Sequence, residues 1–99
     1  LKNGNGAAMP WTVELLEDAF KTLKQMDATT RNRIRRFIRE QLQGTDNPRE
    51  RGKALTGRYA GKWRYRVGDY RLICQLQDAR LVVLVVEIGH RSDVYKGNL

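Results

Sequence analysis

The sequence predicts an α+β domain in which two helices pack on one face of a small sheet. Three observations lead to this class. Two consecutive segments before Gly44 carry apolar residues at helical spacing, a Gly68-Asp69 turn joins two alternating segments, and residues 81–88 are almost all aliphatic. The expected order is an N-terminal strand, a two-helix hairpin and a three-stranded antiparallel meander. A length of 99 residues allows one such domain.

The composition favours a basic domain and excludes several kinds of site. Lysine and arginine number 19 against 11 acidic residues, so the net charge of +8 favours a polyanionic partner, first of all nucleic acid. A solvated cationic surface without a partner is the alternative. The single cysteine excludes an intramolecular disulfide, and with the single histidine it cannot build a structural zinc site. We therefore expect no metal and no cofactor.

Neither a membrane span nor a secretory signal is expected. The longest apolar run, residues 81–86, is shorter than the roughly 18 residues that a spanning helix needs. Residues 1–8 are rich in glycine and asparagine, so they predict a flexible leader or a remnant added for expression, with a natural start at Met9. The expected organisation is this leader and one domain over residues 9–99, in a cytoplasmic protein without a membrane partner.

The first half of the chain predicts one strand and two helices. Residues 11–16 alternate as a short strand does. Apolar residues then recur every three or four positions, which predicts a first helix from Leu16 and a second helix after Asp27. Asp27 or Thr29 is expected to cap the second helix, and Gly44 to end it. The second helix also carries an arginine at every fourth position: Arg31, Arg35 and Arg39.

Residues 61–77 alternate aromatic and basic side chains around Gly68-Asp69. A glycine-first pair predicts a two-residue hairpin turn, so Val67 is expected to pair with Tyr70. This register gathers apolar side chains on the face that the helices cover: Trp63, Tyr65, Val67, Tyr70, Leu72 and Cys74. The opposite face collects four cations: Lys62, Arg64, Arg66 and Arg71. Residues 81–88 are expected to form a central strand covered on both faces.

The four cations on one sheet face repel each other, so their arrangement favours a polyanion that completes it. A solvated outer face is the plainer interpretation. The helical arginine row and three cations of the loop over residues 45–55 are further candidates for phosphate contacts. These loop cations are Arg49, Arg51 and Lys53. His90, at a strand end, is expected to be structural, and Cys74 to be an inert core thiol.

With these motifs the chain resembles the RelE/ParE superfamily of toxin–antitoxin toxins, and most closely its RelE branch. The resemblance runs from Met9 to about Lys96 and is densest over residues 55–95, in the basic and aromatic alternation before GDYR and in the ending GHRSDVY. It implies a ribosome-dependent endonuclease that cleaves messenger RNA in the A site, by attack of the 2′-hydroxyl on the adjacent phosphate. It also implies a cognate antitoxin, the ribosome with its rRNA, and mRNA as partners, with DNA contacted only through the antitoxin.

The resemblance assigns catalytic roles to five residues. Lys62 and Arg64 match paired basic residues of the family, which are both lysine in its best-known member. Arginine stays charged, which argues against proton transfer at position 64. Arg71 and Arg91 match the arginines that hold the scissile phosphate, and Tyr95 matches a tyrosine that stacks on a base. His90 is expected beside this site. The remaining cations are expected to contact RNA or the ribosome: Arg31, Arg35, Arg39, Arg49, Arg51, Lys53 and Arg66.

Two other functions stay open. A ParE-type toxin inhibits DNA gyrase by binding and needs no such cluster, and a plain nucleic-acid-binding module would only neutralise phosphates. The nuclease interpretation makes a geometric demand. Lys62, Arg64 and Arg71 should project from one side of the hairpin into solvent, and Arg71 and Tyr95 should both be exposed.

Overall fold

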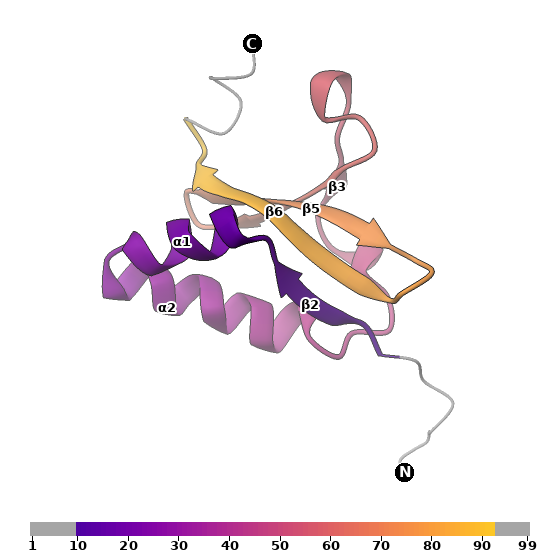
Figure 1. Cartoon of the computed structure of the whole chain (residues 1–99), viewed down its shortest axis with the longest axis horizontal. Helices are drawn as coiled ribbons and strands as arrows, with labels where there is room; N and C mark the ends of the chain where they lie inside the picture. The colour runs from indigo at the N-terminus through magenta and orange to yellow at the C-terminus, as the bar shows by residue number, and fades with distance from the viewer. Residues whose placement is uncertain (1–9, 93–99) are drawn as a thin grey trace.

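The computed structural model describes residues 10–92 (Figure 1). The predicted leader, Met9 and Tyr95 lie outside these residues. The helices and strands are β2 (Thr12–Leu15), α1 (Glu17–Gln25), α2 (Ala28–Phe37), β3 (Lys53–Ala54), β4 (Trp63–Val67), β5 (Tyr70–Gln77) and β6 (Val82–His90). A π-helical turn covers Ile38–Leu42, and 3₁₀ turns cover Pro48–Glu50 and Gly57–Tyr59. Within this part of the chain, no helix has the length and apolar character to cross a membrane.

The five strands form one mixed sheet in the order β2-β6-β5-β4-β3. The antiparallel meander β4-β5-β6 confirms the predicted α+β class. β2 pairs with β6 in parallel, with Thr12 opposite Val82. This pairing follows from the helical hairpin, which carries the chain away after β2 and leaves the edge of β6 free to take the first strand.

The helices begin and end at the positions that the sequence marks. The Asp27 carboxylate caps α2 by accepting hydrogen bonds from the Thr30 backbone N–H at 3.1 Å and from the Thr30 hydroxyl at 2.8 Å. The last turn widens, because the Gln43 N–H donates to the carbonyl of Ile38, five residues earlier. Gly44 follows with φ +83°, which a glycine adopts without strain.

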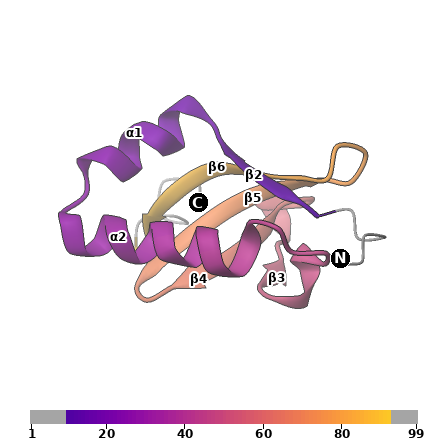
Figure 2. The same cartoon turned by 90° about the horizontal axis from the view of Figure 1, so that it is seen from below.

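The hairpin register is the predicted one, with Val67 opposite Tyr70 and Gly68 at φ +60°. It turns alternate residues of β4 and β5 toward the helices. Figure 2 shows α2 lying across β4 and β5, and buried residues of both helices, Ala19, Leu23 and Ile34, share one core with this face of the sheet. The core between them contains Trp11, Ala19, Leu23, Ile34, Leu42, Tyr65, Val67, Leu72, Cys74, Val83, Val85 and Ile88. Burial of these side chains is the main stabilising term of the fold.

Two features differ from the sequence-based expectation. Lys53 and Ala54, predicted to lie in a loop, form the edge strand β3 against Arg64 and Trp63. β6 is an interior strand, but on the side away from the helices Leu84 is half-buried, so coverage of both faces is partial. The expectation of full coverage was wrong because the helices reach only one face.

Candidate nucleic-acid interface

The face of the sheet that carries no helix brings three of the predicted cations together. Arg66 lies directly opposite Arg71 in the hairpin, and Arg64 is opposite Ile73, so all three arginines share this face as predicted. Lys62 lies just before β4, where its N–H donates to the Tyr59 carbonyl at 2.9 Å. The arginines of the hairpin therefore form one cationic surface on this face of the sheet.

Arg71 is buried on this face, with 9% of its surface exposed. Its Nη1 donates to the carbonyls of Gly68 at 3.2 Å and Tyr70 at 3.1 Å. The prediction that Arg71 is exposed was wrong, because the side chain folds back along its own strand toward the carbonyls of the hairpin turn. The guanidinium is thereby held in one orientation, as a group that binds phosphate in a fixed geometry must be.

Arg91 approaches the same turn from the end of β6. Its backbone N–H donates to the Asp69 carbonyl at 2.7 Å, and its Nε lies 3.6 Å from the Asp69 carboxylate. Both side chains of this pair are largely exposed, at 63% and 70%, so the pair is weak. Arg91 can therefore exchange the carboxylate for a phosphate at the turn whose Gly68 carbonyl accepts from Arg71.

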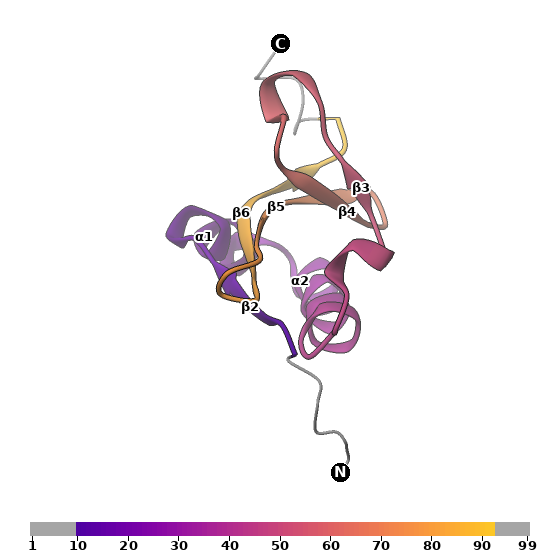
Figure 3. The ribbon, with the colours of Figure 1, turned by 90° about the vertical axis from the view of Figure 1, so that its right-hand side faces the viewer.

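A carboxylate and a tyrosine on this face were not found from the sequence. Glu87 of β6 is opposite Ile73 and accepts a hydrogen bond from the Tyr59 hydroxyl at 3.0 Å. Tyr59 lies in the loop between β3 and β4, which Figure 3 shows rising from the side of the sheet opposite the helices. Only the strand register, which places Glu87 among these arginines, could have indicated it.

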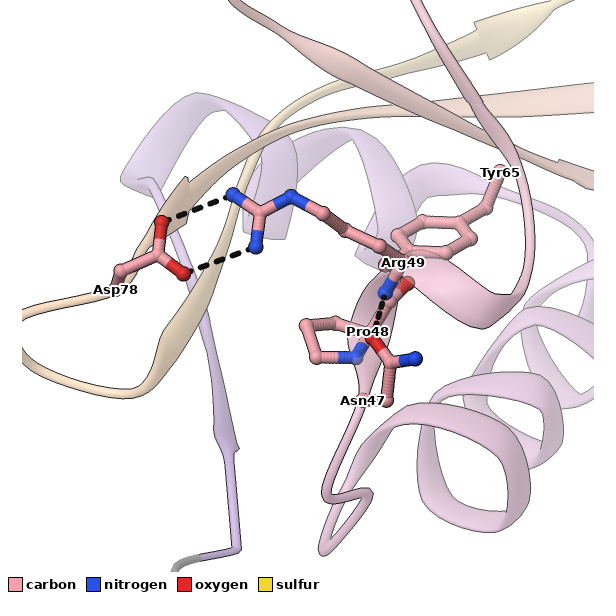
Figure 4. Close-up of polar contacts among 5 residues, drawn as sticks. All are labelled: Asn47, Pro48, Arg49, Tyr65 and Asp78. Carbon is pink, nitrogen blue, oxygen red and sulfur yellow. Dashed lines mark hydrogen bonds and ion pairs between the residues drawn. The ribbon is translucent and has the colours of Figure 1, made fainter.

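Arg49 is fixed by a carboxylate. Its Nη1 and Nη2 donate to the two Asp78 carboxylate oxygens, both at 2.9 Å, in a bidentate pair (Figure 4). The hydrogen bonds from Arg49 hold the pKa of the Asp78 carboxyl below its ordinary value. Nearby, Asn47 accepts from the Arg49 N–H, and the Tyr65 hydroxyl donates to the Pro48 carbonyl at 2.6 Å. Arg49 thus ties the 3₁₀ turn to the β5–β6 turn.

The arginine row of the second helix lies with the helices, away from the cationic face. Arg31 donates to the carbonyls of Met26 at 3.0 Å and Lys24 at 3.4 Å. It thereby supplies a hydrogen-bond donor to backbone carbonyls at the C-terminal end of α1. Arg35 and Arg39 line a groove of about 290 Å³ beside Phe20. The row is therefore not gathered with Arg64 and Arg71.

His90 and Cys74 both face the helices. His90 is opposite Tyr70 in the sheet, with the two rings in an edge-to-face contact at 5.5 Å, and its Nδ1 lies 2.8 Å from the Ser92 hydroxyl. Alternation along β6 places its imidazole on the opposite face from Arg71, since Gly89 is the residue opposite Arg71. Cys74 is fully buried, and burial raises the pKa of its thiol, as expected of an inert core cysteine. Among residues 10–92, no cluster of three His, Cys, Asp or Glu side chains could hold a metal ion.

Residues 13–95 match the model of a family described as the ParE toxin of the type II toxin–antitoxin system parDE. The chain belongs to this toxin family. It is 28% identical to Toxin RelG of Mycobacterium tuberculosis over 88 residues, which cover 89% of this chain and 99% of that protein. It is 30% identical to the mRNA interferase toxin RelE of Escherichia coli K12 over 90 residues, 88% of this chain and 92% of the relative.

Solved structures agree with this assignment of a type II toxin. The toxin–antitoxin complex RelBE2 of M. tuberculosis contains a chain that matches with a TM-score of 0.75 at 27% identity, covering 86% of this chain and 95% of that one. Isolated E. coli RelE matches with a TM-score of 0.66 at 26% identity, covering 89% and 94%. The expectation of a RelE-branch toxin is thereby confirmed.

Proposed function

We propose that this toxin is an endoribonuclease that cleaves mRNA in the ribosomal A site and so stops translation. The observation that carries the proposal is the convergence of Arg71 and Arg91 at the Gly68-Asp69 turn, on the face that also holds Arg64 and Arg66. The naming of related toxins as mRNA interferases supports it. The ribosome and mRNA are the proposed partners of this face.

The proposed reaction is a transesterification. The 2′-hydroxyl attacks the adjacent phosphate, the P–O5′ bond breaks, and the products are a 2′,3′-cyclic phosphate and a 5′-hydroxyl. The phosphorane carries extra negative charge, and guanidinium groups stabilise it through paired N–H···O bonds. We assign this role to Arg71 and Arg91, with Arg64 beside them. Proton transfer falls to Lys62 and Tyr95, because an arginine does not release its proton.

Because the chain is a toxin of a type II toxin–antitoxin system, its partner is a cognate antitoxin. Structural relatives include RelBE complexes from M. tuberculosis and E. coli. A segment rich in carboxylates would meet a domain of charge +8 with complementary charge. We propose that operator DNA is bound through this antitoxin and not by the toxin itself.

The test is cleavage of mRNA on programmed ribosomes, mapped by primer extension, beside a DNA gyrase supercoiling assay. Arg91→Ala should lower the cleavage rate by about 100-fold or more, since one lost phosphate donor has an effect of this size. Arg71→Lys, which keeps the charge but loses the planar fork, should also be strongly impaired. Arg80→Ala is the matched control, because Arg80 is exposed, pairs with Glu14 at 3.1 Å and follows β5 at the end opposite the Gly68-Asp69 turn.

Wild-type cleavage by both Arg91→Ala and Arg71→Lys would refute the assignment of these residues. Inhibition of supercoiling without any mRNA cleavage would replace the nuclease with a ParE-type inhibitor. Because Arg71 is buried, circular dichroism and a melting curve must show that its variant is folded. Arg91 is exposed, so its variant tests the proposal without that complication.

A further inference from the structure

At the edge of the sheet, a cleft is surrounded by Arg51 and Lys53 together with Arg64 and Arg66 of the cationic face. β3 pairs only with Trp63 and Arg64, so within residues 10–92 the rest of β4 has no strand neighbour on that side. Residues 51–53 and the end of α2 flank this bare edge and leave a cleft of about 290 Å³. Its lining residues are Phe37, Arg51, Gly52, Lys53, Arg64, Tyr65 and Arg66.

The walls of this edge cleft are held in place by close contacts. The Trp63 indole N–H donates to the Arg51 carbonyl at 2.7 Å. Gly52, at φ +81°, lies so near β4 that a Cβ there would stand 2.3 Å from the Arg64 carbonyl oxygen. On the other side, the Phe37 ring packs against Tyr65 with centroids 5.9 Å apart. The cleft is therefore largely preformed, as small-ligand sites usually are.

Its cations lack the carboxylate partners that several arginines outside the cleft have. Arg49 and Arg80 pair with Asp78 and Glu14 at 2.9 and 3.1 Å. Within residues 10–92, the structure gives no ion pair or side-chain hydrogen bond to the four cations of the cleft: Arg51, Lys53, Arg64 and Arg66. The Arg64 Nε is buried without a hydrogen-bond partner. Four adjacent positive charges favour a bound anion.

The size and the lining decide which anion fits. A volume of about 290 Å³ is at the lower end of small-molecule sites, which hold roughly 300–1,000 Å³, so it suits one nucleotide and not a polypeptide helix. Guanidinium groups recognise phosphate with a bidentate fork, and unstacked RNA bases pack on aromatic rings. The cleft offers both, with Arg51 and Arg66 for a phosphate and the half-buried Phe37 ring for a base.

We propose that this cleft binds one unpaired nucleotide of the RNA strand beside the scissile linkage. Arg64 lines the cleft and also belongs to the cationic face of Arg71, so one strand can reach both places. The inference rests on the proposed function for the identity of the strand. It assigns affinity for RNA to the edge of the sheet, separately from the phosphate that Arg71 and Arg91 hold.

The test is binding of a short single-stranded oligoribonucleotide that carries 2′-O-methyl groups, measured by fluorescence anisotropy. Without the attacking hydroxyl it cannot be cleaved, so binding is measured apart from catalysis. Arg51→Ala and Arg66→Ala should each weaken binding about tenfold and lower the salt dependence by about one phosphate contact. Arg36→Ala is the matched control, since Arg36 is exposed on α2 outside the cleft, and it should change the affinity less than about twofold.

Equal losses of affinity in all three variants would overturn the inference, because they would show a general effect of the protein's positive charge.

Titration with uridine monophosphate and with inorganic phosphate, followed by the amide resonances of Gly52 and Arg66, tests the base contact. Saturation at lower concentrations of the nucleotide supports the cleft, and equal response to both overturns it. Loss of oligonucleotide binding in the cleft variants together with absent mRNA cleavage on ribosomes would reject the nuclease while leaving the nucleotide site. Active mRNA cleavage on ribosomes with unchanged oligonucleotide binding by the cleft variants would reject the nucleotide site while leaving the nuclease.

Discussion

The hydroxyl of Tyr65 is a polar group inside the core, and one hydrogen bond explains how it is tolerated there. Tyr65 is 1% exposed, and burial raises the pKa of its hydroxyl, so the group stays protonated and donates. The acceptor is the Pro48 carbonyl at 2.6 Å, in the 3₁₀ turn that Arg49 ties to Asp78 (Figure 4). One buried donor thus fixes a surface turn to the middle of β4.

Tyr65→Phe should lower the free energy of unfolding by about 1 kcal/mol, because the Pro48 carbonyl loses its donor while the ring stays. Urea denaturation followed by circular dichroism gives the value. Tyr70→Phe is the control: Tyr70 is half-buried, its hydroxyl has no hydrogen bond within residues 10–92, and the change should stay within about 0.5 kcal/mol. Equal effects of the two variants would contradict the role of the Pro48 contact.

At the scale of a residue, the sequence predicts which face of the sheet Arg71 lies on but not the conformation of its side chain. Alternation around Gly68-Asp69 gave the correct face for Arg64, Arg66 and Arg71. The conformation of a long side chain depends on which acceptors lie within its reach, and here these are the carbonyls of Gly68 and Tyr70. No pattern of residue types encodes that choice, so the burial of Arg71 could not be predicted.

At the scale of elements, the two-residue strand β3 depends on Gly52. This residue has φ +81°, and a Cβ would stand 2.3 Å from the Arg64 carbonyl oxygen and 2.7 Å from the Trp63 indole nitrogen. The first atom belongs to the backbone of β4 and cannot move away alone. β3 can therefore reach β4 only where position 52 has no side chain.

Gly52→Ala should destabilise the protein more than Gly61→Ala does. Gly61 has φ +88°, but no atom lies within 4 Å of the point where a Cβ would stand, so alanine there costs only the left-handed backbone strain of about 1–2 kcal/mol. Alanine at position 52 adds a clash of about 1–3 kcal/mol. Chemical denaturation of both variants measures the difference. If Gly61→Ala were the more damaging, the close approach of β3 to β4 would be wrong.

The elements that the sequence predicts well are those with strong local signals. Asp27 caps its helix, Gly44 follows the last helical turn, and the Gly68-Asp69 hairpin has the expected register. β3 was missed because two residues carry no periodicity, and the parallel partnership of β2 with β6 was missed because nothing local to residues 11–16 indicates which edge they join. Such pairings are set by the whole sheet.

At the scale of the whole molecule, the charges divide into paired and unpaired regions. Carboxylates at a turn, on β2 and on α1 pair with cations, as in Arg49–Asp78, Arg80–Glu14 and Lys21–Glu17. The four cations of the edge cleft have no such partner within residues 10–92, although the chain carries a net charge of +8. Like charges gathered on this side of β4 destabilise the folded state until an anion binds.

A short polyphosphate should for this reason stabilise the folded toxin. At a concentration well above its dissociation constant it should raise the melting temperature by at least about 4 °C, since it binds the folded arrangement of cations in preference to the unfolded chain. Differential scanning fluorimetry measures the shift, with sodium chloride at equal ionic strength as the control. About 0.5 M salt should remove the effect, because the Debye length is then only a few ångströms. An unchanged or lowered melting temperature would mean that the cations are as well accommodated without an anion, and the edge cleft and the cationic face would lose their common physical basis.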